Sequence, residues 1–570
     1  MRVVKPIISL PNKDMIEIQQ QYPSINRRED QIRAFSSPSS GDSSQASSLS
    51  ELSSFERFGL GCNKWSRLGE GNFETLIGTA ISNGVCLIET GQEGGEEAFA
   101  KAYRSLMEKD EILSQHNITV TARFGYRSVT YENSNGENSS EAPSSSINLK
   151  HTSNQILPTD VPLEIINDSK GDSTTQIMHN ISSSFLHETL LSSPLVELQK
   201  DFPQIKLQAM LFNPEVQVKA LLENSTDGEI PELRERQIYI QQKLTSGLEA
   251  LEDLISSGSI SACGITSNGL GLPSSHPLHL SVDTVLNAKS DRMTAIELPA
   301  NLLERQGLDV AREIRSQDSK VEIWAMRPLT CFPDLGTGST KPFALVDYSV
   351  PDPQDPTKQL FTNQLDGPPA IYQVALQTAM SHFDAQFLIE AKQERELTTE
   401  ERETLDGCKL VQSMLHDLDN NLEHVRSFAA HEEELFDRII PLLFDTFEEV
   451  DEDTATVLQT FFAAYGVAVR HAIAKRTRQL LTKGGDKELE TDQMGKTEIY
   501  PDLPDRMTLQ EFAFRSLLSE SVFDRIIVGA SSPTDLMQNL GAFQSISQET
   551  GSPMEACQLL KQKEGDESGV

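Results

Sequence analysis

The chain has 570 residues, a formal net charge of −36 and 37% hydrophobic residues. So large a negative charge repels phosphate backbones and argues against nucleic-acid binding. The six cysteines form no CxxC pair, which argues against a zinc site or a disulfide framework. No apolar run approaches the length of a membrane span, and the length predicts more than one structural unit.

The first 54 residues are polar and rich in serine, which predicts a disordered N-terminal segment. The piece RAFSS at residues 33–37 looks like the cleavage region of a mitochondrial presequence. Asp14 and Glu17 argue against that interpretation, because transit peptides are poor in acidic residues. We therefore expect a cytoplasmic protein, with mitochondrial import as the alternative.

Eight short apolar runs along the chain are typical of β-strands. They begin at residues 58, 85, 118, 205, 260, 294, 321 and 523. Helical patterns lie between them, for example at residues 233–256 and 302–314. This alternation predicts βαβ units and a parallel sheet. The periodicity alone leaves two architectures open, a closed barrel and a doubly wound open sheet.

Motifs at the ends of the later strands favour the barrel. The run Gly264-Ile265-Thr266-Ser267-Asn268 follows one strand, Arg327-Pro328-Leu329 follows another, and GASSPTDLMQNL at residues 529–540 follows the last. These motifs resemble those of the aldo-keto reductase family, whose members are (β/α)8 barrels that reduce carbonyl compounds with NADPH. The resemblance implies an α/β fold, a (β/α)8 TIM barrel with a helical insertion between strand 7 and strand 8.

The predicted organisation has five parts. They are a disordered segment at 1–54, barrel strands 1–7 at 55–332 with a flexible insertion at 133–176, a mainly helical insertion at 333–506, the barrel closure at 507–550, and a polar tail at 551–570. Both insertions follow strands, so we expect them to leave the barrel at its C-terminal face, where ligands bind. Residues 182–198 are expected to be helical, and Thr398 is expected to cap a later helix.

The family's catalytic tetrad is an Asp, a Tyr, a Lys and a His, and this chain differs at each position. The matching positions are Glu89 for Asp, Glu93 or Gly94 for Tyr, Arg123 for Lys, and Phe212 for His. A Glu89–Arg123 ion pair across neighbouring strands is expected, and we interpret it as a structural pair in place of a catalytic one. Tyr126 could serve as a substitute acid or could pack against a loop.

The resemblance also implies NADP as a possible cofactor. The positions that match its binding residues are Ser267, Asn268, Glu297, Arg327, Ser531, Ser532, Gln538 and Asn539. By resemblance, Ser267, Asn268 and Glu297 would hold the nicotinamide carboxamide, and Arg327 would lie near the pyrophosphate. Ser531 and Ser532 would open a helix that holds the 2′-phosphate. Gln538 and Asn539 would lie by the adenine. The alternative is an inherited loop shape that binds no ligand.

Two functions therefore compete. The first is an NADP-dependent oxidoreductase with weak or altered reduction of a small-molecule carbonyl substrate. The second is a catalytically inactive pseudoenzyme that senses a cofactor or serves as a protein-interaction scaffold, with the acidic helical insertion contacting a protein partner. We expect no metal site, because the acidic run that begins at His431 is typical of a solvated first helical turn.

Overall fold

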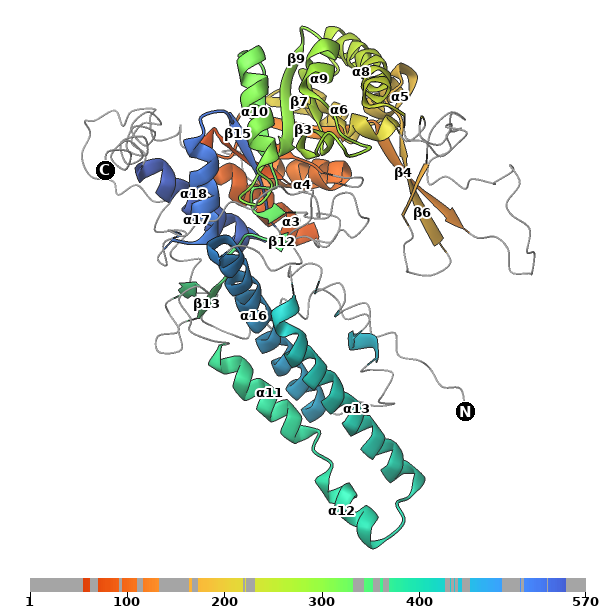
Figure 1. Ribbon diagram of the computed structural model, residues 1–570, viewed down its shortest axis with the longest axis vertical. Helices are drawn as coiled ribbons and strands as arrows, with labels where there is room; N and C mark the ends of the chain where they lie inside the picture. The colour runs from red at the N-terminus through yellow and green to blue at the C-terminus, as the bar shows by residue number, and fades with distance from the viewer. Residues whose placement is uncertain are drawn as a thin grey trace. The chain divides into compact units, whose positions relative to one another are not determined.

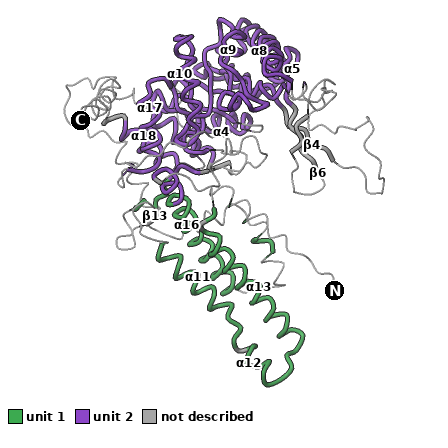
Figure 2. Tube along the Cα trace, viewed as in Figure 1, with its two compact units in different colours: residues 1–53, 347–475 green, residues 54–346, 476–570 purple. Residues whose placement is uncertain are grey.

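The protein was analysed as a computed structural model (Figure 1). The structure describes residues 55–61, 70–91, 95–109, 116–132, 163–166, 173–218, 221, 231–331, 343–351, 359–361, 369–425, 431, 435, 439–442, 452–483, 503, 507–530 and 532–549. The predicted N-terminal segment, Glu93, Ser531 and the C-terminal tail lie outside these residues. Two compact units divide the chain, one of residues 1–53 and 347–475, the other of residues 54–346 and 476–570 (Figure 2).

The second unit contains a closed barrel of eight parallel strands. Their order around the barrel is β1-β15-β10-β9-β8-β7-β3-β2. The strands are β1 (Phe58–Gly61), β2 (Leu87–Glu89), β3 (Ile118–Phe124), β7 (Ile205–Phe212), β8 (Ala262–Thr266), β9 (Met293–Pro299), β10 (Glu322–Met326) and β15 (Arg525–Gly529). The predicted (β/α)8 barrel is confirmed, and its last strand closes the barrel between β1 and β10 across the long insertion.

Helices surround the barrel between its strands. They are α3 (Glu70–Ser82), α4 (Gly95–Lys109), α5 (Ser183–Leu191), α6 (Pro194–Asp201), η4 (Pro214–Gln217), α8 (Leu233–Ser256), η5 (Gly269–Gly271), α9 (Val282–Ala288), α10 (Gln306–Gln317), α17 (Leu509–Ser519) and α18 (Pro533–Glu549). The helical stretch expected at residues 182–198 is present, and it is divided into two helices because α5 ends and α6 begins within it. Pro194 stands at the start of α6 and Ser193 caps it, which is the usual place for both residue types.

A three-stranded antiparallel sheet stands where the sequence predicted a mostly flexible insertion. Its strands are β4 (Tyr126–Glu132), β5 (Leu163–Ile166) and β6 (Ser173–His179), in the order β4-β6-β5. Gly125, with φ +94°, lies between β3 and β4, and its backbone conformation is one that residues with a side chain rarely adopt. Within the predicted insertion at 133–176 the structure describes residues 163–166 and 173–176, and these form β5 and the start of β6, which pairs with β4.

The interior of the barrel is arranged in layers along its axis. The middle layer is apolar and consists of Leu87, Met210, Ala295, Trp324 and Ile527. Two residues further along β2 and β9 stand Glu89 and Glu297, which share the inward face because side chains alternate along a strand. The layer nearest the C-terminal ends of the strands is therefore polar, and it is also buried.

The first unit contains the helices of the insertion. They are α11 (Ala370–His382), α12 (Gln386–Glu394), α13 (Thr399–Asn421), η7 (Leu422–His424) and most of α16 (Glu452–Lys483). Thr398 caps α13 as expected, through a capping box with Glu401. Tyr372 packs against Tyr465 with ring centroids 5.9 Å apart and donates a 2.7 Å hydrogen bond to Asp419, which ties three helices together.

One described helix, residues Glu452–Thr482 of α16, is long and apolar enough to cross a membrane by length and composition alone. Half of its most apolar window is buried inside the protein, as in a core helix of a soluble domain. Short strands complete the described structure. They pair as β11 (Thr330–Cys331) with β12 (Phe343–Ala344), and as β13 (Ser349–Pro351) with β14 (Gln359–Phe361).

Candidate functional site at the barrel mouth

Two of the tetrad positions, Glu89 and Arg123, meet Glu297 in a buried ion cluster at the C-terminal ends of β2, β3 and β9. Arg123 Nε donates a 2.7 Å hydrogen bond to Glu89 Oε1, so the ion pair expected from the sequence is present. A second carboxylate oxygen, Glu297 Oε2, lies 3.9 Å from the same guanidinium. Side-chain exposure is 9% for Arg123, 6% for Glu89 and 1% for Glu297. At such burial both the interaction between charges and the cost of removing them from water are larger than for a surface pair.

Burial sets the protonation of this cluster. Burial, followed by the negative charge of Glu89, raises the pKa of Glu297 to about 8, although Arg123 and a hydrogen bond from Thr266 oppose the shift. Burial lowers the pKa of Arg123, but Glu89, Glu297 and Tyr126 more than compensate and raise it above the ordinary value. Glu297 therefore keeps its proton to a higher pH than an ordinary glutamate, beside a guanidinium that stays charged.

The protonated state of Glu297 changes what this side chain can do. The sequence alone suggested an ionised carboxylate that accepts hydrogen bonds but cannot donate. In the structure, Glu297 Oε2 accepts a 2.6 Å bond from Thr266 Oγ1. The other oxygen, Glu297 Oε1, is buried and has no hydrogen-bond partner among the described residues. A protonated Glu297 could donate a hydrogen bond, which an ionised carboxylate cannot do.

An aromatic group lies beside the ion cluster. The ring of Phe212, at the end of β7, has the Arg123 guanidinium carbon 4.9 Å from its centroid. The Tyr126 ring lies 5.1 Å from Phe212 and the His179 ring lies 6.4 Å from it. Tyr126 donates a 3.5 Å hydrogen bond to the carbonyl of Gly91, in the connection between β2 and α4. The position of the family's histidine is thus apolar, but an imidazole from β6 stacks on it.

The residues matched to the nicotinamide carboxamide contact the protein itself. Ser267 Oγ donates a 2.8 Å bond to Glu215 Oε2, and the Gly269 N–H donates a 2.8 Å bond to Glu215 Oε1. The Asn268 N–H donates to the Asn213 side chain at 3.1 Å. Burial raises the pKa of Glu215 to about 7, although the hydrogen bonds that it accepts oppose the shift. The segment after β7 therefore occupies the donors at the end of β8.

The remaining matched positions are also engaged. Arg327, with φ +59°, forms a 2.8 Å ion pair with Glu304, and Asn301 holds both through bonds to the Arg327 carbonyl and the Glu304 side chain. Ser532 Oγ accepts a 3.1 Å bond from the Asp535 N–H at the start of α18. Asn539 is buried and donates to the Gly529 carbonyl at 3.4 Å, while Gln538 lies on α18 half-buried.

The groups present do not fit NADP in the arrangement that the resemblance implies. The Ser267 hydroxyl points its proton at Glu215, and Arg327 is neutralised by Glu304. Asp535 adds a negative charge to the first turn of α18, where a 2′-phosphate would need a positive environment. A group of three or more metal-ligating side chains was not found among the residues that the structure describes.

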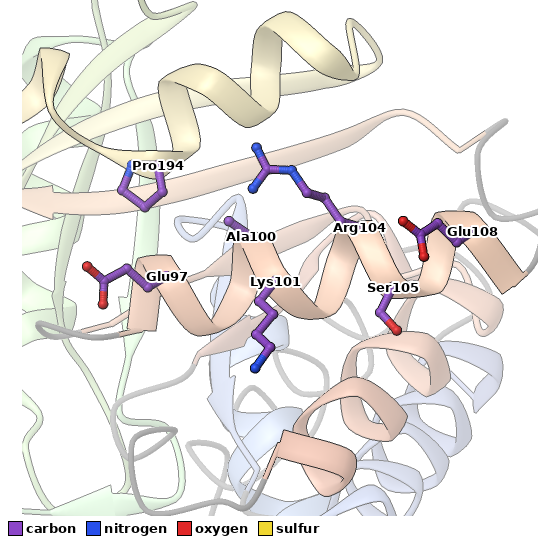
Figure 3. A pocket seen from close by; sticks show the side chains of 7 residues that line it. All are labelled: Glu97, Ala100, Lys101, Arg104, Ser105, Glu108 and Pro194. Atoms are coloured by element: carbon purple, nitrogen blue, oxygen red, sulfur yellow. The ribbon is translucent and has the colours of Figure 1, made fainter.

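A hollow on the outer surface is separate from the barrel mouth. Figure 3 shows its lining side chains, which come from α4 and the start of α6: Glu97, Ala100, Lys101, Arg104, Ser105, Glu108 and Pro194. Arg104 forms a 3.1 Å ion pair with the exposed Asp201 at its edge. None of these residues stands at the C-terminal end of a barrel strand, so the barrel mouth remains the candidate site.

Sequence reasoning did not identify Glu215, Thr266 or His179 as parts of this site. Glu215 stands in the segment FNPE that directly follows β7, so its place after a barrel strand was a usable signal. His179 lies at the end of β6, outside the barrel, and nothing in its local sequence connects it with Phe212. Its position follows only from the pairing of β4 with β6.

The strand order and the closed barrel define the class of this protein, a (β/α)8 barrel. No protein-family model and no curated protein matches the chain. Two solved structures, both described as a "putative aldo-keto reductase" from Pseudomonas aeruginosa, are similar to it at 14% identity and a TM-score of 0.26, covering 48% of this chain and 74% of theirs. A likeness this weak carries no argument about function.

Proposed function

We propose that this chain is an oxidoreductase-like barrel protein that does not carry out ordinary NADP-dependent carbonyl reduction and acts instead by binding. The observation that carries the proposal is the hydrogen bond from Ser267 to Glu215. A nicotinamide carboxamide would need the Ser267 hydroxyl as a hydrogen-bond donor. If the hydroxyl turned to the cofactor, Glu215 would lose this hydrogen bond, at a cost of roughly 1–3 kcal/mol. Binding of NADP must therefore overcome an internal competitor.

The ion cluster supports the same proposal on the catalytic side. Arg123 is held between Glu89 and Glu297 and stays protonated, so it cannot release a proton to a developing alkoxide. Phe212 has no donor at the position matched to the family's histidine. A reductase of this type loses general acid catalysis, which is typically worth about 10²–10⁴ in rate.

The partner side of the proposal rests on the helical insertion. Helix α13 carries six acidic residues, Glu400, Glu401, Glu403, Asp406, Asp417 and Asp419, against Arg402 and Lys409. Such a surface favours a basic protein partner, because complementary charges increase the rate of association. The cytoplasmic location, with the mitochondrial alternative, remains a prediction.

Titration of the purified protein with NADPH, followed by cofactor fluorescence, tests the proposal. We expect no saturable change up to about 1 mM, the upper end of ordinary Michaelis constants. The variant Glu215→Ala frees the Ser267 hydroxyl, and a gain of binding in this variant alone would identify Glu215 as the competitor. Glu232→Ala, at an exposed position before α8, is the matched control. Saturable micromolar binding by the native protein, lost in Asn268→Ala, would overturn the proposal.

A second candidate is weak or altered carbonyl reduction with Tyr126 as the acid. It is favoured by the electrostatic interaction of Tyr126 with Arg123 and by the hydrogen bond of its hydroxyl to Gly91, in the loop that carries the family's tyrosine position. The test is NADPH oxidation with a panel of aldehydes, quinones and sugars. Turnover at or above about 1 s⁻¹ that Tyr126→Phe abolishes would establish this candidate in place of the first.

A further inference from the structure

Tyr126 and His179 face each other across the two strands that extend from the barrel mouth. They are directly paired residues of β4 and β6 in the antiparallel register. Their ring centroids lie 6.2 Å apart at an interplanar angle of 34°. Directly paired residues of an antiparallel sheet hold their side chains on the same face. The pairing thus places a phenol and an imidazole, two groups that exchange protons, side by side.

The barrel supplies a charged neighbour to this pair. Arg123 interacts electrostatically with Tyr126, and its guanidinium lies against the Phe212 ring that both aromatic residues contact. A proton that leaves the Tyr126 hydroxyl leaves a negative oxygen, which the buried guanidinium stabilises. The Tyr126 hydroxyl donates a hydrogen bond to the Gly91 carbonyl, which orients the O–H group.

The location of the pair is also the place where barrels of this class act. Tyr126 follows β3 after one glycine, and Phe212 ends β7, so the group lies at the C-terminal ends of the strands. The buried carboxyl group of Glu297, whose pKa burial raises, lies 3.9 Å from the Arg123 guanidinium, and such a displaced pKa is typical of functional sites. Tyr126 is partly exposed, and the buried ring of His179 is its direct neighbour at 6.2 Å between ring centroids.

We propose that Tyr126 and His179 form a proton-transfer centre that enolises a small carbonyl compound without a cofactor. This activity goes beyond the proposed function, since it requires no NADP and no hydride. It needs only an acid at the carbonyl oxygen, a base at the neighbouring carbon, and a charge that stabilises the intermediate oxygen. Tyr126, His179 and Arg123 provide these three in turn.

The reaction is balanced within the substrate and the two side chains. The imidazole of His179 takes a proton from the carbon next to the carbonyl, and the electrons of that C–H bond form the carbon–carbon double bond of the enol. The π electrons of the carbonyl move to its oxygen, which takes the proton of the Tyr126 hydroxyl. Return of a proton from the imidazole to the same carbon, and of the proton of the enol oxygen to the Tyr126 oxygen, restores the carbonyl compound and regenerates both groups.

The charges at the site indicate the substrate class. Glu89 compensates Arg123 at 2.7 Å, and Glu297 is mostly protonated at neutral pH. The cluster therefore carries no net charge for a phosphate ester or a carboxylate, and the whole chain repels anions at a net charge of −36. We infer that the substrate is a neutral hydroxy-carbonyl compound, for which dihydroxyacetone is a suitable probe.

The test is exchange of the carbon-bound protons of dihydroxyacetone in D₂O, followed by proton NMR with the full chain and no added nucleotide. We expect exchange above that of the buffer and of heat-denatured protein. Tyr126→Phe and His179→Gln should each slow the protein-dependent exchange about 10²–10⁴-fold, the usual contribution of a general acid or base. Dihydroxyacetone phosphate should exchange no faster than in buffer.

Matched controls separate catalysis from folding. Tyr239→Phe on α8 and His187→Gln on α5 remove the same groups from outside the barrel mouth and should leave the exchange unchanged. Circular dichroism establishes that each variant is folded, and Tyr126→Phe should be, because it removes only a hydroxyl with a long 3.5 Å bond. Exchange by the native protein at the buffer rate overturns the proposal, and so does an unchanged rate in either folded variant.

Discussion

Two layers of the same barrel interior differ in what they contribute. The middle layer of Leu87, Met210, Ala295, Trp324 and Ile527 is apolar and stabilises the barrel by removing hydrocarbon from water. The layer above it contains Glu89, Arg123, Thr266 and Glu297, which are nearly as buried but carry charges and hydrogen bonds. Burying these charges costs desolvation free energy that the ion pair does not fully recover. The comparison teaches that removing one partner of the polar layer leaves a buried charge unpaired, whereas shortening a side chain of the apolar layer only reduces its packing.

The largest expected effect comes from breaking the upper layer. Arg123→Ala leaves Glu89 and Glu297 buried without their cation and should lower the free energy of unfolding by about 3–5 kcal/mol. Urea unfolding followed by tryptophan fluorescence measures the change. Arg312→Ala removes a cation whose side chain is 49% exposed, and it should cost only about 0–1 kcal/mol. Equal losses in the two variants would contradict the contrast between the buried cluster and the surface.

A smaller effect is expected at the end of β8. Ser267→Ala removes the hydroxyl that donates to Glu215 and accepts from the Leu270 N–H, and should cost about 1–3 kcal/mol of unfolding free energy. The same urea experiment serves, with Ser257→Ala on the exposed end of α8 as a control near zero. A loss as small as that of the control would show that Glu215 finds another partner, and would weaken the argument against NADP binding.

The middle layer should respond less to a conservative change. Ile527→Val removes one methylene from a close-packed position and should lower the unfolding free energy by about 0.5–1.5 kcal/mol. Ile371→Val, at a side chain that is 53% exposed, should have almost no effect. A larger loss of unfolding free energy in Ile527→Val than in Arg123→Ala would contradict the comparison, because the apolar layer would then be the more sensitive of the two layers to substitution.

The variant Glu297→Gln should differ little from the native protein in unfolding free energy at low pH, and the difference should grow as the pH rises. The folded pKa of Glu297 is raised to about 8 from an ordinary value of 4.5, so the folded state binds the proton more tightly. The stability that this provides is fully present below pH 4.5 and is lost as the pH rises through about 8. The native protein should therefore lose more stability than Glu297→Gln between pH 5 and pH 8.

Thermal unfolding at several pH values measures this difference. The curves of the two proteins should be closest at pH 5 and should separate toward pH 8, with the variant the more stable at the upper end. Parallel curves would mean that the pKa of Glu297 is not raised in the folded state.

The sequence by itself determined the strands and the ion pair between two of them. Runs of apolar residues are local signals, and β3 and β7 begin and end where the pattern predicts. The Glu89–Arg123 pair was predictable because residues at the ends of consecutive parallel strands lie at the same edge. The helical stretch expected at residues 182–198 is divided into two helices at a local signal, the proline at position 194.

Only the tertiary structure decided what surrounds these residues. Glu215 and Ser267 are 52 positions apart in the chain, and Tyr126 and His179 are paired through a sheet that no periodicity predicted. The protonation of Glu297 depends on its burial and on the distance to Glu89 and Arg123, which follow from closure of the barrel. The physical reason is that the spacing of apolar residues and the capping of helices depend only on residues close together in the chain. Desolvation and side-chain hydrogen bonds instead depend on groups that meet only after the chain has folded.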